Sequence, residues 1–480
     1  MKELKQIAIS AIEEKSEVFT SLSDKIWEYA ELSLKEYKSA KEYVKLLSEL
    51  GFEAREKVSG IDTAFLGKFG RGAPVIGILG EFDALSGLSQ KGASAKKEPL
   101  EPSGNGHGCG HNMLGAGALA AAYGVKEYLS KTGKPGTVIF FGTPGEEGGA
   151  GKAFMAKTGE WRKLDAALTW HPSDTNEIVS GTCNSCIQVL YKFYGVASHA
   201  AGDPENGRSA LDAVELMNTG VQYLREHVKS DARIHYAIID GGGFSPNVVQ
   251  PTASVLYMTR SLLVKDTLEL QARVDKIADG AAMMTETTYE RVFIDGCSNT
   301  VPNHTLEELL YKNMKEVGIA SYTDEEWEFA GALKATYETY DIPTVAARYD
   351  DGAKALVKEL SLDGKKALYD FIAPLYGGDF FMAGSTDVGD VSWQTPTAQI
   401  NTVCFAGGAP GHSWQNVSIG KSTIGHKGLI SAGKILAASA VELFESPEIL
   451  AKAKLEFDSA TDGAYYCPIP ENEFAKPVEI

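Results

Sequence analysis

The segment over residues 104–122, GNGHGCGHNMLGAGALAAA, carries three reactive side chains at alternate positions, His107, Cys109 and His111. In an extended segment, side chains at positions i and i+2 lie on the same side, and glycine lets the backbone approach a ligand closely. Cys109 and His111 can therefore reach one metal ion. A thiolate and an imidazole suit zinc, and similar sites hold manganese or cobalt. Taken alone, the pair fits a buried thiol beside a core histidine better than a metal site.

Further metal-capable side chains follow runs of β-type apolar residues. Glu146 and Glu147 come after TVIFFG and before glycines. His171 follows AALTW, and His412 follows CFAGGAPG. Because ligands gather at the carboxyl ends of strands in open α/β sheets, we expect these side chains to face one crevice. Together with the thiol and imidazole they supply five candidate ligands and a spare carboxylate, enough for two metal ions with open positions.

The sequence patterns around these side chains predict two structural units. Apolar β-type runs alternate with helical patterns over residues 74–171, which predicts a three-layer α/β/α domain. A stretch of small apolar residues indicates a helix packed closely on the sheet, with Asn112 as its candidate N-cap. Residues 187–298 follow the order β-α-β-β-α-β, which predicts a ferredoxin-like α+β sheet. We therefore expect a discontinuous domain over 1–186 and 299–480, with residues 187–298 inserted into it.

Composition limits the classes of partner. The chain has 480 residues, which predicts about two domains. It carries 64 acidic and 46 basic side chains, a formal charge of -18 that disfavours nucleic acid and anionic membrane surfaces. The N-terminal segment has a charged helical pattern, and no apolar run resembles a signal peptide or a membrane span, so we expect a cytoplasmic protein.

The six cysteines are scattered without a secretory leader, which favours reduced thiols over a disulfide framework. Cys183 and Cys186 form an isolated C-x-x-C pair that lacks a thioredoxin-like context. Two packed thiols are the favoured interpretation, and a redox or metal site is the alternative. The stretch over residues 320–376 has helical patterning but no motif that we can interpret.

Six segments carry a family resemblance that spans almost the whole chain in order. They resemble the amidohydrolase branch of the aminoacylase and carboxypeptidase-G metallopeptidase family, and within it the p-aminobenzoyl-glutamate hydrolase group. The segments are WEYAELSLKEYKSAKEYVKLLSELGFE, GEFDAL, GHGCGHNMLGAGAL, GTPGEEGGAGKAFM, GVASHAAGDPENGRSALDAV and STDVGDVSW.

This resemblance implies hydrolysis of an amide bond next to a free carboxylate by an enzyme with two adjacent divalent metal ions. Zinc is the expected metal, with manganese or cobalt as alternatives. By motif position, Glu146 would be the general base, and the metal ligands would be Cys109, His111, Glu147, His171 and His412. The expected substrates are N-acyl or N-aroyl amino acids, of which p-aminobenzoyl-glutamate is the first to test.

The resemblance also implies that the inserted domain is a lid and dimerisation domain. His199 would polarise the scissile carbonyl, often in the active site of the partner subunit. Asn247 and Arg260 match lid positions that hold polar groups of the substrate, and Asp83 would support a metal ligand from behind. The free edge of the predicted lid sheet favours a homodimer joined through residues 187–298, and a hetero-oligomer with a related subunit is the alternative.

Two positions depart from the family pattern. Asn112 replaces the usual aspartate and Leu114 the usual histidine, which puts in question the hydrogen bonds expected from Asn112 behind the ligands. His107 is expected to support the site rather than to bind metal. The alternative functions are a dipeptidase or aminoacylase of the same family, a non-catalytic binding subunit, and a redox protein that uses Cys183 and Cys186.

Overall fold

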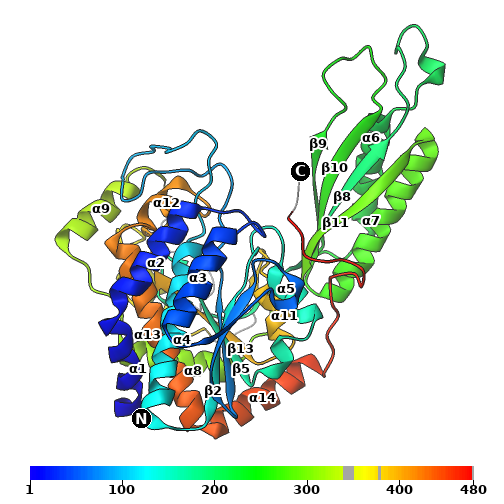
Figure 1. Cartoon of the computed structure of the whole chain (residues 1–480). Coiled ribbons are helices and arrows are strands. Elements are labelled where there is room, and N and C mark those ends of the chain that lie inside the picture. Colours follow the sequence, from blue (N-terminus) through cyan, green and yellow to red (C-terminus); the bar gives the residue numbers. More distant parts are fainter. Residues whose placement is uncertain (339–350, 377–379, 478–480) are drawn as a thin grey trace.

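The larger part of the molecule is built on a seven-stranded sheet. The computed structural model describes residues 1–338, 351–376 and 380–477 (Figure 1). The strand order in this sheet is β1-β2-β4-β3-β5-β13-β6. The strands are β1 (Glu53–Glu56), β2 (Phe65–Arg71), β3 (Val75–Gly80), β4 (Gly136–Gly142), β5 (Ala166–Ser173), β6 (Glu177–Val179) and β13 (Thr397–Val403).

Four neighbouring strands of this sheet, β4, β3, β5 and β13, run parallel. Strands β2 and β6 pair antiparallel with the two sides of this block, and β1 pairs antiparallel with β2. The carboxyl ends of the four parallel strands therefore meet at one edge, as the polar segments after the apolar runs predicted.

Helices cover both faces of the sheet, because alternate side chains of each buried strand enter different cores. Ile76 and Ile78 of β3 pack in one core, and Leu79 packs in the other. The first core receives α1 (Lys2–Glu14), α2 (Ser16–Tyr29), α3 (Tyr37–Glu49), α4 (His111–Thr132), α8 (His304–Val317), α9 (Asp324–Lys334), α12 (Trp414–Ile419), α13 (Thr423–Glu445) and α14 (Pro447–Thr461). The second receives α5 (Gly151–Lys157) and α11 (Val388–Ser392).

Helix α4 lies tightly against the sheet and against α13, and this packing places its N-terminus at the carboxyl edge of the sheet (Figure 1). A Cβ atom at Gly117 would come within 2.7 Å of the Trp170 ring and 2.9 Å of the Leu429 carbonyl oxygen. The Trp170 indole also donates a hydrogen bond to the Leu114 carbonyl at 2.8 Å. The small residues of α4 therefore serve close packing.

The helix begins at His111, and Gly110 is its N-cap, so the expectation that Asn112 caps the helix is wrong. Gly110 has φ +82°, and a Cβ atom there would lie 2.8 Å from Met113. A glycine is needed because an L side chain would be both strained and crowded in this turn. Asn112 lies inside the first turn, and its amide donates to Ser23 Oγ at 3.0 Å.

The smaller part is a four-stranded antiparallel sheet with strand order β11-β8-β10-β9. Two helices cover one of its faces, and the unit projects from the larger part (Figure 1). This order of elements and strands is ferredoxin-like, and the predicted fold class is confirmed. The elements are β8 (Ser185–Tyr194), α6 (Ala210–Leu224), β9 (Arg233–Asp240), β10 (Thr252–Ser261), α7 (Val264–Thr285) and β11 (Thr288–Cys297).

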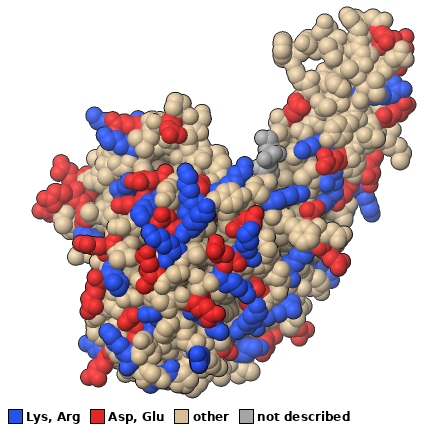
Figure 2. All heavy atoms as spheres, viewed as in Figure 1, with Lys and Arg blue, Asp and Glu red and all other residues tan. Residues whose placement is uncertain are grey.

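A short parallel pair, β7 (Thr182–Cys183) with β12 (Phe381–Met382), lies beside the entry to the smaller unit. The uninterpreted stretch over residues 320–376 contains α9 and α10 (Asp351–Leu360), and its residues 339–350 lie outside the described residues. Across the described ranges no helix combines the length and apolar character needed to cross a membrane. Acidic and basic side chains are interspersed on the face seen in Figure 2.

Candidate metal centre

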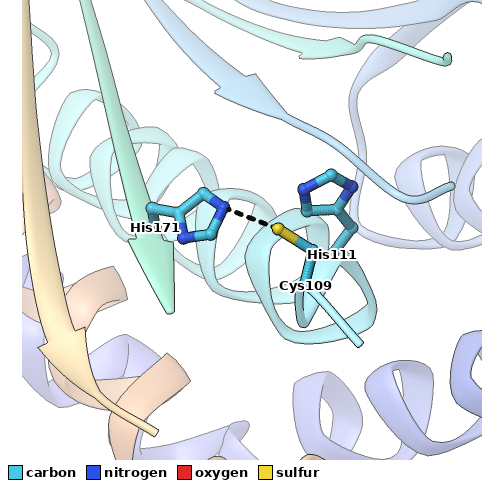
Figure 3. Close-up of side chains that lie close together, drawn as sticks. All are labelled: Cys109, His111 and His171. Carbon is cyan, nitrogen blue, oxygen red and sulfur yellow. Dashed lines mark hydrogen bonds between the residues drawn. The ribbon is translucent and has the colours of Figure 1, made fainter. Parts of the chain in front are cut away.

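The structure brings Cys109, His111 and His171 together at the carboxyl edge of the large sheet. Cys109 and His111 come from the turn that starts α4, and His171 comes from the end of β5. The Cys109 sulfur lies between the two imidazole rings, 3.3 Å from His171 Nε2 (Figure 3). The ligand atoms of these three residues all lie within 4.8 Å of one another, which is close enough for one cation to contact all three.

A second group shares Cys109 and adds Glu147 and His412, again with all ligand atoms within 4.8 Å of one another. Glu147 follows β4, and His412 follows β13. His412 Nε2 lies 3.6 Å from Glu147 Oε1. The two groups therefore contain all five predicted ligands, and the thiol that they share lies between two candidate cation positions.

Asp83 forms hydrogen bonds with one residue of each group, His111 and Glu147. His111 Nδ1 donates to Asp83 Oδ1 at 2.9 Å, and the other carboxylate oxygen accepts from Glu147 N at 2.9 Å and from Ser33 Oγ at 2.7 Å. Burial disfavours the charged form of Asp83, but the hydrogen bond from His111 prevails and lowers its pKa to about 2. The carboxylate stays ionised and fixes the tautomer that leaves His111 Nε2 free to bind a cation.

The donor set fits a divalent cation. His111 Nε2 and Glu147 Oε1 are buried and make no hydrogen bond to any described residue. Such unpaired buried groups are costly in the absence of a ligand. Burial lowers the pKa of His171 to about 4, so this imidazole is neutral, the form that binds metal. Burial raises the pKa of Cys109 to about 12, and a nearby cation would stabilise its thiolate instead.

Glu146 lies in a third group with Glu81 and His111, whose ligand atoms are likewise within 4.8 Å of one another. Burial, and then the negative charges of Glu81 and Asp387, raise the pKa of Glu146 well above its usual value. A carboxylate in such a setting accepts a proton readily. Glu146 is therefore suited to take a proton from water and to return it.

Sequence reasoning missed three buried charged residues near Glu146: Glu81, which belongs to this group, and the pair Lys152 and Asp387. Lys152 Nζ lies 2.7 Å from Glu81 Oε1 and 2.5 Å from Asp387 Oδ1, and its side chain has no exposed surface. Glu81 stands two positions before Asp83 in GEFDAL, which was the only local signal for it. Lys152 and Asp387 are 235 positions apart, so their pairing has no local signature.

The lid residues lie apart from this cluster. His199 and Asn247 are exposed on two neighbouring loops, joined by a hydrogen bond from Ala200 N to the Asn247 carbonyl at 3.0 Å. His199 Nδ1 accepts from the backbone amides of residues 201 and 202, so Nε2 carries the proton and can donate it. Arg260 lies near the other end of β10, eight residues or about 26 Å from the loop end of that strand.

Other predicted residues have local partners outside the three groups. Arg260 Nη1 donates to Ser385 Oγ at 2.6 Å, at the junction of the two units. The buried His107 ring lies 3.0 Å from the Ile26 carbonyl oxygen through Nε2, and the residue is in none of the three groups. Asn112 bonds Ser23 as described above, and Ser23 belongs to none of these groups either.

A cavity of about 740 Å³ opens beside the cluster. Cys109, His171 and His412 line one side of it, and apolar side chains that include Phe405 and Pro410 line another. This volume and mixed lining are typical of sites for small molecules. The cavity gives a ligand direct access to both candidate cation positions.

The six cysteines are free thiols. Cys186 Sγ lies 3.4 Å from Cys297 Sγ on the paired strand β11, and Cys183 is fully buried. In the sheet, Cys186 therefore has Cys297 as its partner rather than Cys183. Neither Cys183 nor Cys186 belongs to a metal-capable group within the described residues.

Comparison with known proteins decides the family. The model of peptidase family M20/M25/M40 matches residues 77–398, which include the four-stranded unit and every member of the three metal-capable groups except His412. The chain belongs to this family. Membership confirms the enzyme class expected from the sequence, a hydrolase of amide bonds.

Two relatives show the range of proteins to which this M20/M25/M40 member is similar. The chain is 43% identical to a subunit of p-aminobenzoyl-glutamate hydrolase from Escherichia coli (strain K12) over 484 residues, which cover 100% of both chains. It is 30% identical to Xaa-Arg dipeptidase of Mus musculus over 335 residues, which cover 67% of this chain and 73% of the relative. The first comparison spans the lid and the metal-capable cluster alike.

Solved structures of M20-type proteins share the fold. An aminobenzoyl-glutamate utilization protein from Klebsiella pneumoniae aligns with TM-score 0.57 at 16% identity and covers 90% of this chain and 97% of its own. A dinuclear metal-binding peptidase of the M20 family from Bacillus subtilis aligns with TM-score 0.53 at 16% identity and covers 90% and 99%. At these identities the comparisons support the two-unit α/β architecture alone.

Proposed function

We propose that this M20/M25/M40 member is a metal-dependent amidohydrolase that cleaves the amide bond of N-acyl or N-aroyl amino acids, with p-aminobenzoyl-glutamate as the first candidate substrate. The observation that carries the proposal is the convergence of thiol, imidazole and carboxylate ligand atoms at the carboxyl edge of the large sheet, beside a cavity of about 740 Å³. The full-length similarity to one chain of a p-aminobenzoyl-glutamate hydrolase supports the choice of substrate.

Two divalent cations would be held by the two groups that share Cys109. When bound, such cations polarise a carbonyl oxygen and make water more acidic at neutral pH. The dinuclear peptidase from Bacillus subtilis supports the number of ions, and the donor set of thiolate, imidazole and carboxylate favours zinc over harder ions. The ligands would be Cys109, His111, Glu147, His171 and His412.

Glu146 would act as the general base and then as the general acid. Its raised pKa lets it accept the proton of the attacking water and pass it to the departing nitrogen, so water adds across the C–N bond and an acid and an amine leave. Asp83 would keep His111 in the metal-binding tautomer during this cycle.

His199 would donate a hydrogen bond from Nε2 to the scissile carbonyl oxygen, because its Nδ1 is occupied by backbone amides. Asn247 lies beside it and would bind a polar group of the substrate. Both stand about one strand length from Arg260. Groups at opposite ends of one lid sheet can meet in a compact site if they come from two subunits. Arg260 would then come from the chain that carries the metal ligands, and His199 and Asn247 would come from the partner.

The proposed homodimer would form through the edge strand β9. Its outer backbone edge pairs with no other strand among the described residues, and Tyr236, Ile238 and Ile239 are 40–49% exposed on it. Exposed apolar edge strands are sites of pairing between chains. Light scattering should give the mass of a dimer. A mixture of inactive Glu146→Gln and inactive His199→Ala subunits should recover activity after subunit exchange, because one of the mixed sites is intact.

The test of the activity uses metal-loaded protein and p-aminobenzoyl-glutamate, with release of p-aminobenzoate and glutamate followed by chromatography. An N-acetyl amino acid and an Xaa-Arg dipeptide form the comparison panel. We expect the aroyl substrate to give the highest kcat/KM. Hydrolysis of the dipeptide alone would instead identify a dipeptidase, and no hydrolysis of any compound by protein with full metal content would reject the proposal.

A further inference from the structure

Glu81 is a buried carboxylate that faces the metal-capable cluster from the end of β3. Its side chain is 4% exposed. One oxygen, Oε1, pairs with Lys152 Nζ at 2.7 Å, and the other, Oε2, lies 3.2 Å from His111 Nε2. None of the roles discussed so far explains why a carboxylate is placed at this nitrogen.

The Nε2 atom of His111 is positioned to bind a cation. Nδ1 of His111 donates to Asp83, so Nε2 is the nitrogen left for a proton or a cation, and Nε2 makes no hydrogen bond within the described part of the chain. A lone pair facing a carboxylate oxygen is repulsive unless a proton or a cation lies between them. The two atoms therefore mark a position for a positive charge.

The spacing of these two atoms matches two ligands of one ion. Ligand distances of about 2.0–2.2 Å and a tetrahedral angle separate neighbouring ligand atoms by about 3.3–3.6 Å, and a right angle separates them by about 2.8–3.1 Å. The observed 3.2 Å between Glu81 Oε2 and His111 Nε2 corresponds to a ligand–metal–ligand angle between a right angle and the tetrahedral angle. His111 also belongs to the group with Cys109 and His171, whose ligand atoms lie within 4.8 Å of one another.

Lys152 fixes the orientation of the Glu81 carboxylate. The lysine is itself anchored, because Asp387 accepts from Lys152 Nζ at 2.5 Å and from its backbone N at 2.8 Å. With Oε1 committed to the ammonium, only Oε2 can turn toward His111. The ammonium also offsets one of the two buried negative charges beside it, so the carboxylate can stay ionised without a large cost.

We propose that Glu81 is an additional carboxylate ligand of the metal centre, positioned by Lys152. The inference rests on the proposed metal-dependent function. It assigns to the cation at His111 Nε2 a ligand beyond the five that the sequence predicted. An ion pair between Glu81 and a protonated His111, without any metal contact, is the competing interpretation of the same contact.

The test measures metal affinity rather than turnover. Chelator-stripped protein is titrated with Co²⁺ against a competing chelator, and bound metal is counted by mass spectrometry. Glu81→Gln removes the charge but keeps the shape and an oxygen for Lys152. We expect at least one of the two ions to bind more weakly by more than the about 10- to 100-fold that loss of a group supporting a ligand costs, with a changed Co²⁺ absorption spectrum.

Glu442→Gln is the matched control. Glu442 is also a buried glutamate held by lysine, with Lys5 Nζ at 2.6 Å and Lys312 Nζ at 2.5 Å, and it belongs to none of the metal-capable groups among the described residues. Both substitutions should lower Tm. Only the substitution at Glu81 should weaken Co²⁺ binding.

Glu81→Asp provides a second variant that keeps the charge and withdraws the carboxylate by one methylene. It too should weaken Co²⁺ binding and change the spectrum. Two ions bound with wild-type affinity and an unchanged spectrum in either folded variant would overturn the inference and leave the ion pair as the explanation. Failure of the wild-type protein to bind any ion would instead reject the proposed function.

Discussion

The carboxyl edge of the large sheet and the loop end of the small sheet differ in how completely they are organised. At the carboxyl edge, Asp83 accepts three hydrogen bonds, and each of the three metal-capable groups has its ligand atoms within 4.8 Å of one another. At the loop end, His199 and Asn247 are exposed, and their hydrogen bonds described above stay within the two lid loops. The metal-capable groups are thus preorganised within one chain, whereas the two lid residues make no contact with them in the described structure.

One short segment connects the two regions. Ser385 accepts a hydrogen bond from Arg260 of the lid, and Asp387, two residues later, anchors Lys152 behind the metal-capable cluster. Asp390 then accepts a hydrogen bond from Ser298, where the chain returns from the lid. The contrast predicts that substitutions at the cluster change metal content or turnover, and that substitutions in the lid change substrate selection.

The largest effect is expected at Glu146. Glu146→Gln should keep both metal ions and lose about 10²- to 10⁴-fold in turnover, because a general base is removed without removing any of the five proposed ligands. Steady-state kinetics and metal analysis on the same preparation check this. Turnover near the wild-type value would remove Glu146 from the mechanism.

Cys109 should couple metal content to activity. Because Cys109 is common to two ligand groups, Cys109→Ala should lower metal occupancy and turnover together. Cys183→Ala is the control, since Cys183 is a fully buried thiol outside those groups. It should change neither quantity. Full metal content and full rate in Cys109→Ala would show that the shared thiol is not a ligand.

The sequence was sufficient for the features that depend on local pattern. Apolar runs that end in polar residues located β3, β4, β5 and β13, and their parallel pairing placed the predicted ligands at one edge. The alternation of strands and helices likewise predicted the four-stranded unit. These predictions succeeded because each depends on the burial of neighbouring residues along the chain.

Features that depend on a backbone turn or on residues distant in the chain could not be predicted from the sequence. The cap of α4 was assigned to Asn112 from its residue type, but the left-handed turn at Gly110 places the cap two residues earlier. The Glu81–Lys152–Asp387 cluster joins three distant segments, and no periodicity records such a pairing. The separation of Arg260 from His199 became visible only once the strand order was known.

Substitution of Arg260 in the lid is expected to have a smaller effect, which is on substrate discrimination. A guanidinium suits bidentate recognition of a carboxylate, so converting the free α-carboxylate of the substrate to its amide should reduce kcat/KM by at least ~10-fold. In Arg260→Ala that discrimination should disappear while the metal content is unchanged. Arg291→Ala is the control, because Arg291 pairs with Asp275 on the lid surface. Unchanged discrimination in Arg260→Ala would rule out this recognition scheme.

The smallest effect on turnover is expected at Asp390, which joins the two regions. Its carboxylate accepts from Ser298 N at 2.9 Å, from Ser298 Oγ at 2.7 Å and from Tyr465 OH at 2.8 Å. Burial nevertheless raises its pKa to about 7. Between its ordinary pKa of 3.8 and pH 7 the folded state holds a proton that the unfolded state has lost, so its contribution to stability falls as pH rises through this window.

Asp390→Asn removes this titration and should leave turnover unchanged. Between pH 5 and pH 8, the difference in unfolding free energy between the variant and the wild type should therefore move in favour of the variant by roughly 3 kcal/mol, the scale of two pKa units. Denaturant unfolding at both pH values measures it. A difference that stays constant with pH would show that Asp390 is ionised throughout, and that the junction between lid and metal-capable cluster carries a charge rather than a proton.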